Sequence, residues 1–229
     1  MSTIPTNTAL DPVPNTQKDF YDWAERHALK VELARSGEYE LIFIGDSITH
    51  LFEVEGYGAD VWRQYYGQRR VLNLGYGWDC TQNVRWRLAQ GEFTGQQPSL
   101  VVLNIGTNNL TGNSAARANT AAEIVDGIFE ICRDIHQQSA QTVILIMGIF
   151  PRGLTTDPIH AQVTELNAML CAQLPVDSRL RYVDIGERFL GPEGEIPLAL
   201  MQDRCHPTTA GYAIWAAAIE PFIAQYLQG

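Results

Sequence analysis

Five short runs of apolar residues recur along this chain of 229 residues, and each is closed by Gly, Asn, Asp or Pro. Most of the runs are continuous in Val, Ile and Leu, which is typical of strands buried on both faces of a sheet. The five predicted strands are Leu41–Ile44, Val71–Leu74, Leu100–Ile105, Val143–Phe150 and Arg181–Ile185. A chain with this pattern is expected to build its core around one central sheet.

The segments between the runs carry helical signals. Ala115–Gln137 has apolar side chains at steps of three and four residues, and Asp157 followed by Pro158 is a favourable helix start. The predicted helices are Trp23–Arg35, Glu53–Tyr66, Thr81–Gln90, Ala115–Gln137, Pro158–Leu174 and Thr208–Leu227. This alternation predicts an α/β fold with one parallel sheet and helices on both faces. We expect a single domain over residues 20–229, after a polar N-terminal arm, residues 1–19, with little intrinsic order.

Composition and charge exclude several classes of function. With 16 Lys and Arg against 26 Asp and Glu, the net charge is −10 at pH 7, so nucleic acids and anionic membrane surfaces would be repelled. The longest apolar run, Val143–Phe150, is too short to span a bilayer, and the polar N-terminus does not resemble a signal peptide. Four cysteines lie far apart without CxxC spacing, which argues against disulfides and a zinc site. We expect a cytoplasmic protein that acts on a small molecule.

The residues that follow the strands carry the chemistry, because ligand sites of parallel sheets lie at the carboxyl ends of the strands. Among seven serines, only Ser47 is placed where a buried strand passes directly into a helix. Its backbone N–H would lie at the positive end of that helix, which favours a developing oxyanion. A serine in this position is also a common helix N-cap, so Ser47 alone does not identify a nucleophile.

A serine nucleophile needs a base, and the base needs an orienting carboxylate. His206 follows Asp203 by three residues, so both side chains can face one side of a single turn, although His206 could instead merely open the last helix. The order Ser, Asp, His along the chain matches a known type of catalytic triad. Asp157 and His160 have the same spacing, but a helix start explains Asp157 better. The remaining histidines have other expected positions: the pocket rim for His50, and solvated helix faces for His27 and His136.

Two turns could donate hydrogen bonds to the oxygen that gains negative charge during acyl transfer. Asn108 offers a side-chain amide after the third strand, and the loop Gly75–Asp79 offers backbone N–H groups. Gly and Asn are also common in turns, so each feature alone is only moderately specific, whereas their joint occurrence at strand ends is a strong signal. Three aromatic residues could line an apolar acyl pocket or pack in the core: Tyr57, Trp62 and Trp78.

Four segments together resemble the four motif blocks of the SGNH, or GDSL, hydrolase family. The segments are Gly45-Asp46-Ser47, Gly75–Asp79, Gly106-Thr107-Asn108-Asn109 and Asp203-Arg204-Cys205-His206. Further stretches resemble the subgroup that contains the catalytic subunits of intracellular platelet-activating-factor acetylhydrolase: Leu72-Asn73-Leu74-Gly75, Trp86-Arg87-Leu88 and Pro151-Arg152-Gly153. The resemblance covers the chain from about Trp23 to the C-terminus.

The resemblance implies a three-layer flavodoxin-like fold, with a five-stranded parallel sheet in the order 2-1-3-4-5, and a metal-independent serine esterase without a cofactor. It implies a catalytic triad of Ser47, Asp203 and His206. The implied oxyanion hole consists of the N–H groups of Ser47 and Trp78 and the amide of Asn108. The implied substrate-binding residues are Asp46, Gly77 and Arg152. Related subunits form dimers, so a homodimer is expected.

Two departures from the family pattern bear on the substrate. Trp78 stands where the family usually has glycine; the backbone N–H is kept, but the indole would narrow or roof the pocket. His206-Pro207-Thr208 with Gly211-Tyr212 is closer to bacterial carbohydrate acetylesterases than to phospholipid-cleaving subunits. We expect a small acyl group, above all acetyl, and leave the alcohol open between a carbohydrate and a phospholipid like platelet-activating factor.

Three other functions remain open on the sequence alone. A flavodoxin-like flavin or nucleotide module is suggested by Gly75-x-Gly77 after a strand, but a dinucleotide fingerprint needs a third glycine where Cys80 stands. A relative that has lost catalysis is disfavoured by the complete set of site residues. Thioesterase and peptidase activities stay possible, because the same triad serves all acyl transfers.

Overall fold

One parallel sheet forms the centre of the protein. We describe a computed structural model of the chain, which places residues 6–175 and 179–227. Its strands are β1 Leu41–Gly45, β2 Val71–Gly75, β3 Leu100–Asn104, β4 Val143–Met147 and β5 Leu180–Val183. All four pairings are parallel, in the order β2-β1-β3-β4-β5, which confirms the predicted topology.

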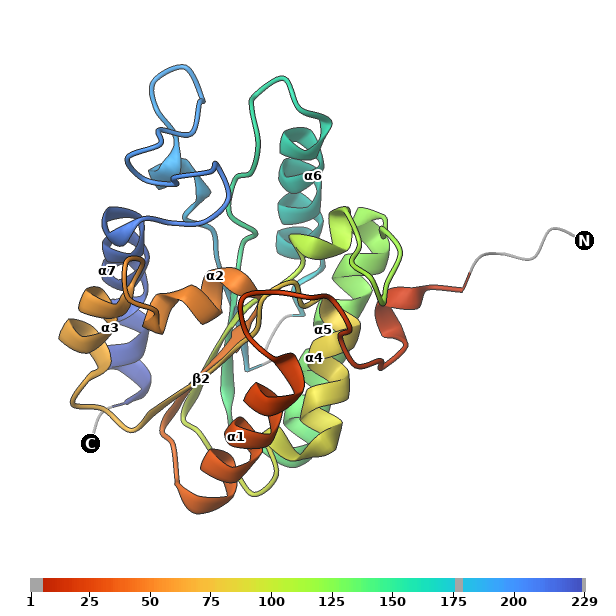
Figure 1. Ribbon diagram of the computed structural model, residues 1–229, viewed down its shortest axis with the longest axis vertical. Coiled ribbons are helices and arrows are strands. Elements are labelled where there is room, and N and C mark those ends of the chain that lie inside the picture. Colours follow the sequence, from red (N-terminus) through yellow and green to blue (C-terminus); the bar gives the residue numbers. More distant parts are fainter. Residues whose placement is uncertain (1–5, 176–178, 228–229) are drawn as a thin grey trace, which may run out of the picture.

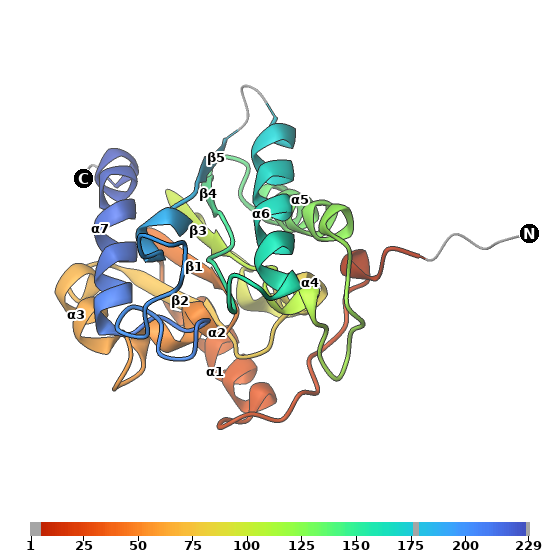
Figure 2. The ribbon, with the colours of Figure 1, turned by 90° about the horizontal axis from the view of Figure 1, so that it is seen from above.

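Helices cover both faces of the sheet (Figures 1 and 2). One face packs against α1 Trp23–Ser36, α4 Thr81–Arg87, α5 Ala121–Gln138 and α6 Pro158–Gln173. The opposite face packs against α3 Ala59–Tyr66 and α7 Thr209–Tyr226, and the short helix α2 Ser47–His50 lies at the end of β1. Continuous apolar strands are explained by this arrangement, because each strand faces a separate apolar cluster on either side.

Three predicted helices differ from the structure in their bounds by more than one residue, whereas α1, α6 and α7 agree with the prediction to within one residue at each end. The stretch predicted as Glu53–Tyr66 is a 3-10 turn, Leu51–Glu53, followed by α3, because Gly56 adopts a φ of 82° between them. The stretch predicted as Thr81–Gln90 is α4 followed by a π turn, Leu88–Glu92, which ends around Gly91. Helix α5 begins at Ala121 instead of Ala115, because Thr120 and Glu123 form a capping box there.

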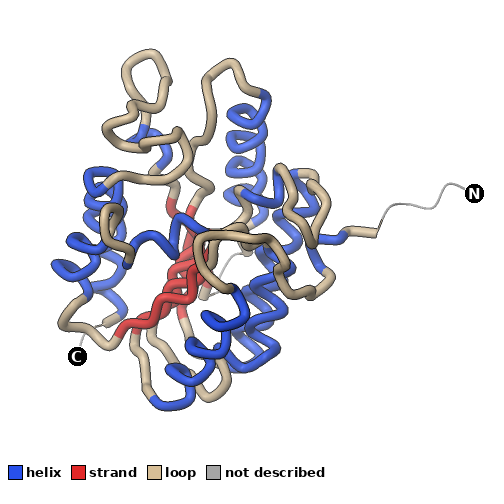
Figure 3. Tube along the Cα trace, in the orientation of Figure 1, coloured by secondary structure: helices blue, strands red, loops and turns tan. Residues whose placement is uncertain are grey.

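The N-terminal arm, which in the structure comprises the described residues 6–22 before α1, was predicted to have little order but is packed against the domain. Ala9 is fully buried, and its carbonyl accepts a hydrogen bond of 3.0 Å from the Thr81 hydroxyl. The Asn15 amide donates to the Asp79 carboxylate at 3.0 Å. Figure 3 shows the arm as an extended loop that passes along the sheet before entering α1. The long-range hydrogen bonds of polar side chains therefore order a segment that has few apolar residues.

The long loops after β4 and β5 project from the carboxyl edge of the sheet, at the top of Figure 3. This is the edge at which ligand sites of parallel sheets form. Within the described ranges, no helix is long and apolar enough to cross a bilayer.

Candidate active site

Ser47 is presented at the carboxyl end of β1 by a tight junction with α2. Asp46 is the helix N-cap, and its Oδ1 accepts a hydrogen bond of 2.9 Å from the Ile48 N–H, so Ser47 is the first helical residue and not the cap. Gly45 is needed for this close approach, because a Cβ there would lie 2.2 Å from Thr49 Oγ1 and 2.3 Å from the Asn104 carbonyl. The junction holds the Ser47 hydroxyl at the edge of the sheet.

The side chains of Ser47, His206 and Asp203 form one continuous hydrogen-bonded chain. Ser47 Oγ lies 2.9 Å from His206 Nε2, and His206 Nδ1 lies 2.7 Å from Asp203 Oδ2. These distances leave Nε2 free to accept the serine proton when Nδ1–H is donated to the carboxylate. Ser47 and His206 are 159 residues apart in the sequence, so only the fold brings them together.

A tight turn before α7 fixes Asp203 and His206 relative to each other. Asp203 Oδ1 accepts hydrogen bonds from the backbone N–H groups of Cys205, at 3.0 Å, and His206, at 2.7 Å. Arg204 takes a left-handed φ of 58°, and its carbonyl accepts a hydrogen bond from Gly153 N–H at 3.0 Å. Partial burial raises the pKa of Asp203, but the hydrogen bonds from His206 outweigh burial and hold that pKa below its usual range. The carboxylate therefore stays ionised beside the imidazole.

A cavity of about 280 Å³ opens at this chain of three residues. Its walls come from the loops after several strands and from the N-terminal arm: Asp19, Phe20, Ser47, Leu51, Tyr57, Trp78, Asn108, Arg152, Asp203, Cys205 and His206. Cys205 is not a competing nucleophile, because burial raises the pKa of its thiol to about 12. The cavity has room for a short acyl group and part of an alcohol.

Three predicted hydrogen-bond donors lie at or beside this cavity. Trp78 and Asn108 line it, and the Asn108 amide donates one hydrogen to the Asp79 carbonyl at 3.1 Å, leaving its second hydrogen available. Trp78 adopts a left-handed φ of 64°, which is unusual for a residue with a bulky side chain. Across the described chain, the backbone N–H groups of Ser47 and Trp78 have no hydrogen-bond acceptor.

The structure separates the predicted substrate-binding residues. Arg152 lines the cavity and donates to the Thr107 carbonyl at 3.2 Å. Asp46 is completely buried and serves as the helix cap, so the structure gives it a structural role, and its contact with substrate stays a prediction. Gly77 is also buried, and a Cβ there would lie 2.0 Å from the Asp19 carboxylate; its contact with substrate likewise stays a prediction. The same carboxylate would repel a phosphate group approaching Gly77, which disfavours a nucleotide in this loop.

Several aromatic and histidine side chains lie elsewhere than predicted. Tyr57 and Trp78 line the cavity, whereas Trp62 packs in the core against Phe43 and Phe52. His50 is buried beneath the rings of Phe20 and Tyr21 instead of lying at the rim, and burial lowers its pKa to about 3. Nor are two other histidines solvated as predicted: His27 bonds Glu92 at 2.8 Å, and His136 bonds the Thr142 carbonyl at 3.0 Å.

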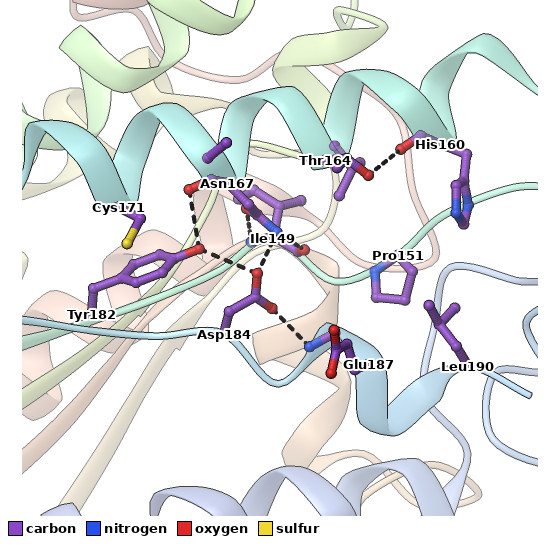
Figure 4. A pocket seen from close by; sticks show the side chains of 13 residues that line it. Ile149, Pro151, His160, Thr164, Asn167, Cys171, Tyr182, Asp184, Glu187 and Leu190 are labelled. Carbon is purple, nitrogen blue, oxygen red and sulfur yellow. Dashed lines mark hydrogen bonds between the residues drawn. The ribbon is translucent and has the colours of Figure 1, made fainter. Parts of the chain in front are cut away.

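A larger cavity of about 460 Å³ lies between α6 and β5, away from Ser47 (Figure 4). His160 is at one end of this cavity, while the Asp157 carboxylate is bonded to the Leu154 N–H at 2.7 Å. The Asp184 carboxylate within the cavity already accepts from Asn167, Tyr182 and Gly186. Since none of the carboxylates that the structure describes is bonded to His160, the alternative pair with the same sequence spacing does not form a base and its partner.

The N-terminal arm supplies site residues that the sequence analysis missed. Asp19 and Phe20 line the cavity beside Ser47, and Phe20 is 67% exposed there. The cluster of acidic and aromatic residues directly before α1 could have indicated a functional segment. The sequence does not show which loop this cluster contacts. In the described segments, no group of three or more His, Cys, Asp or Glu side chains is placed to hold a metal ion.

A serine, a histidine and a carboxylate in contact at the carboxyl edge of a parallel sheet form an arrangement that is typical of α/β serine hydrolases. Comparison with known proteins gives the family. The model of the GDSL-like Lipase/Acylhydrolase family matches residues 43–214, most of the chain. The chain therefore belongs to the GDSL-like lipase/acylhydrolase family, and it is a carboxylic ester hydrolase.

Individual relatives agree with this assignment. Platelet-activating factor acetylhydrolase IB subunit alpha2 of Rattus norvegicus is 30% identical over 219 residues, covering 94% of this chain and 91% of the relative. A GDSL-like lipase from Bacteroides thetaiotaomicron has a TM-score of 0.71 at 17% identity, covering 89% and 98% of the two chains. The acetyl xylan esterase AlAXEase has a TM-score of 0.66 at 17% identity, covering 82% and 100%. The two solved structures share the fold.

Proposed function

We propose that the protein is a serine esterase that removes short acyl groups, above all acetyl, from an ester oxygen. The single observation that carries this proposal is the unbroken contact from Ser47 Oγ to His206 Nε2, at 2.9 Å, and from His206 Nδ1 to Asp203, at 2.7 Å. In this proposal Ser47 is the nucleophile, His206 the general base and Asp203 the residue that orients the imidazole.

In the proposed reaction, Ser47 Oγ attacks the ester carbonyl carbon while its proton passes to His206 Nε2. The carbonyl oxygen becomes negative and accepts hydrogen bonds from the N–H groups of Ser47 and Trp78 and from the Asn108 amide. The C–O bond to the alcohol then breaks, and His206 returns the proton to the leaving oxygen. Water, deprotonated by the same imidazole, hydrolyses the acyl-serine and releases the carboxylic acid.

Two alcohols remain candidates for the natural ester. Relatives are named platelet-activating factor acetylhydrolase and acetyl xylan esterase, and both names point to acetyl esters. The cavity of about 280 Å³ suits a small acyl group. Rates on an acetylated xylo-oligosaccharide, a short acetyl phospholipid and an acyl-CoA, compared at equal concentration, would identify the preferred alcohol or a thioesterase activity.

The proposal is tested with p-nitrophenyl acetate. Ser47→Ala is expected to lower kcat by about 10³-fold or more with the fold intact, because it removes the nucleophile. Ser36→Ala is the matched control, since the Ser36 hydroxyl bonds only the Glu32 and Leu33 carbonyls within α1. Covalent labelling by phenylmethanesulfonyl fluoride should add one adduct to the parent protein and none to Ser47→Ala. Full turnover in Ser47→Ala would refute the proposal.

We also propose that the protein acts in the cytoplasm as a homodimer, as the family resemblance implies. Light scattering coupled to size-exclusion chromatography measures the mass directly against the 25.6 kDa of one chain.

A further inference from the structure

The loop that carries the Trp78 N–H is hydrogen-bonded to side chains of the N-terminal arm. Asn15 Nδ2 lies 3.0 Å from Asp79 Oδ1 and 3.4 Å from the Gly77 carbonyl oxygen, and the Tyr21 hydroxyl lies 3.4 Å from that same oxygen. The contact is close: a Cβ on Gly77 would lie 2.0 Å from the Asp19 carboxylate. Two side chains of the arm therefore bind the carbonyl of the peptide that links Gly77 to Trp78.

The next two carbonyls of this loop are also bound by side chains. The Trp78 carbonyl accepts a hydrogen bond of 2.9 Å from Asn113 Nδ2, and the Asp79 carbonyl accepts one of 3.1 Å from Asn108 Nδ2. Each of three consecutive peptides thus has its orientation set by a donor from a distant segment. The Gly77–Trp78 peptide is the one whose donors come from the arm.

Peptide geometry connects this carbonyl to the catalytic donor. In a trans peptide the C=O and N–H point in opposite directions, so a Gly77 carbonyl held by the arm directs the Trp78 N–H away from the arm. That N–H finds no acceptor in the part of the chain that the structure describes, and Trp78 lines the cavity that holds Ser47. The carbonyl that the arm binds and the N–H that has no acceptor therefore belong to the same peptide unit.

Backbone strain shows why this peptide needs to be held. Trp78 has a φ of 64°, and left-handed φ costs an L-residue with a side chain more than it costs glycine. Rotating the Gly77–Trp78 peptide by half a turn would bring φ of Trp78 to a relaxed negative value. The same rotation would replace the N–H donor at the cavity by a carbonyl oxygen, which would repel a developing oxyanion.

We infer that Asn15 and Tyr21 are positioning residues that hold the Gly77–Trp78 peptide in its strained orientation, with the Trp78 N–H available to the ester oxygen. This inference rests on the proposed function, because it assigns that N–H to the oxyanion. Neither side chain is among those lining the cavity, so they act through the peptide. Glycine at position 78 would need less holding, since glycine adopts either sign of φ.

The experiment measures kcat and KM for p-nitrophenyl acetate and for its thiono analogue, in which sulfur replaces the carbonyl oxygen. The variants are Tyr21→Phe, which keeps the ring on His50, Asn15→Ala, and their combination. The combination is expected to lower kcat for the oxygen ester by about 10- to 100-fold, less than the roughly 10²- to 10³-fold loss for removing one oxyanion donor outright, with KM changed less than about threefold. The thiono ester should lose less, because sulfur is a weaker hydrogen-bond acceptor.

Strain is tested by repeating the substitutions in a Trp78→Gly background. There the same arm variants are expected to lower kcat by less than about threefold relative to Trp78→Gly alone, because the relaxed glycine no longer favours rotation of the peptide. Thr16→Val is the matched control within the arm, since the Thr16 hydroxyl bonds the Ser114 hydroxyl and not the loop. It should stay within about twofold of the parent protein.

The outcomes separate this inference from the proposed function. If the arm variants keep the parent kcat and the parent ratio of oxygen-ester to thiono-ester rates while Ser47→Ala is inactive, the inference alone is overturned. It is also overturned if the arm variants lose the same factor in kcat with Trp78 and with Gly at position 78, because that result means a purely structural role. Turnover by Ser47→Ala would overturn the proposed function instead, and the inference with it. If the combined variant does not fold, Tyr21→Phe in both backgrounds decides the question alone.

Discussion

Trp78 has a strained backbone conformation, and its side chain lines the cavity beside Ser47. Its φ of 64° costs about 1 to 2 kcal/mol relative to a relaxed conformation, and its indole is 39% exposed. The sequence placed Trp78 at the site, and Trp78 lines the cavity; that its indole narrows the cavity stays a prediction. The sign of φ could not be predicted from the residue type, since tryptophan rarely adopts it.

We predict that Trp78→Gly lowers the free energy of unfolding by less than about 1 kcal/mol, because released strain offsets the lost packing. The ratio of kcat/KM for p-nitrophenyl hexanoate to that for the acetate should rise about tenfold, as the roof of the cavity is removed. Urea denaturation and initial rates measure the two effects. Trp62→Gly, in the core, is the matched control and should cost about 3 to 5 kcal/mol. An unchanged ratio would mean that the indole does not limit acyl length.

Asp46, directly before Ser47, is a buried carboxyl whose charge is unfavourable. Burial raises its pKa from 3.8 to about 7, and the Asp79 carboxylate adds to this effect, while the Ile48 N–H opposes it. The pKa of Asp46 is therefore higher in the folded protein than in the unfolded chain. Its contribution to the free energy of unfolding is fully present below the unfolded pKa and is lost as pH rises through about 7. The protonated form is therefore the one that the fold prefers.

Asp46→Asn should remove this pH dependence, since an amide keeps the Oδ1 acceptor for Ile48 and cannot ionise. We expect the parent and the variant to differ little in unfolding free energy near pH 4, and the variant to gain on the parent by a few kcal/mol, to order of magnitude, between pH 4 and pH 8. Chemical denaturation at four pH values measures this. Parallel curves for the two proteins would show that Asp46 does not titrate in this window.

At the scale of elements, local patterns predicted strands better than helix ends. Apolar runs located all five strands; the first four are almost completely buried, which leaves a strong signal, whereas β5 comes from a mixed run and is only partly buried. Two errors had readable signals: Gly56 and Gly58 interrupt the stretch before α3, and the capping box of Thr120 and Glu123 marks the start of α5. The predicted triad residues came together because strand ends of a parallel sheet share one edge.

Other elements could not be placed from local patterns. The arm is ordered by hydrogen bonds such as Asn15 to Asp79 and Thr81 to Ala9, which span more than 60 residues and leave no periodic trace. His27 looked solvated on an outer helix, yet it bonds Glu92 from a distant turn. Long-range polar contacts of this kind position the arm beside the candidate site. They cannot be predicted from the spacing of apolar residues.

Across the whole molecule, one buried charge connects the parts that build the candidate site. Arg87 is fully buried; its guanidinium donates to the Asp79 carboxylate at 2.7 Å, to Glu92, and to the Leu74 carbonyl at 3.2 Å, and it lies over the Tyr76 ring. Asp79 also receives hydrogen bonds from two N-terminal residues, Asn15 and Trp23. The arm, β2, α4 and the turn after α4 therefore meet at this guanidinium.

Removing this charge should destabilise the protein far more than removing a neighbouring one. Arg87→Met keeps the apolar stem but leaves Asp79 and Glu92 buried without their cation, and we expect a loss of about 3 to 5 kcal/mol in unfolding free energy. Arg85→Met on the same helix is the comparison: Arg85 is partly exposed, pairs with Asp134 and donates to the Leu10 carbonyl, and because water still reaches both charges we expect a smaller loss of about 1 to 2 kcal/mol. Urea denaturation compares the two variants. Equal losses would mean that the buried cluster contributes no more than a partly exposed ion pair.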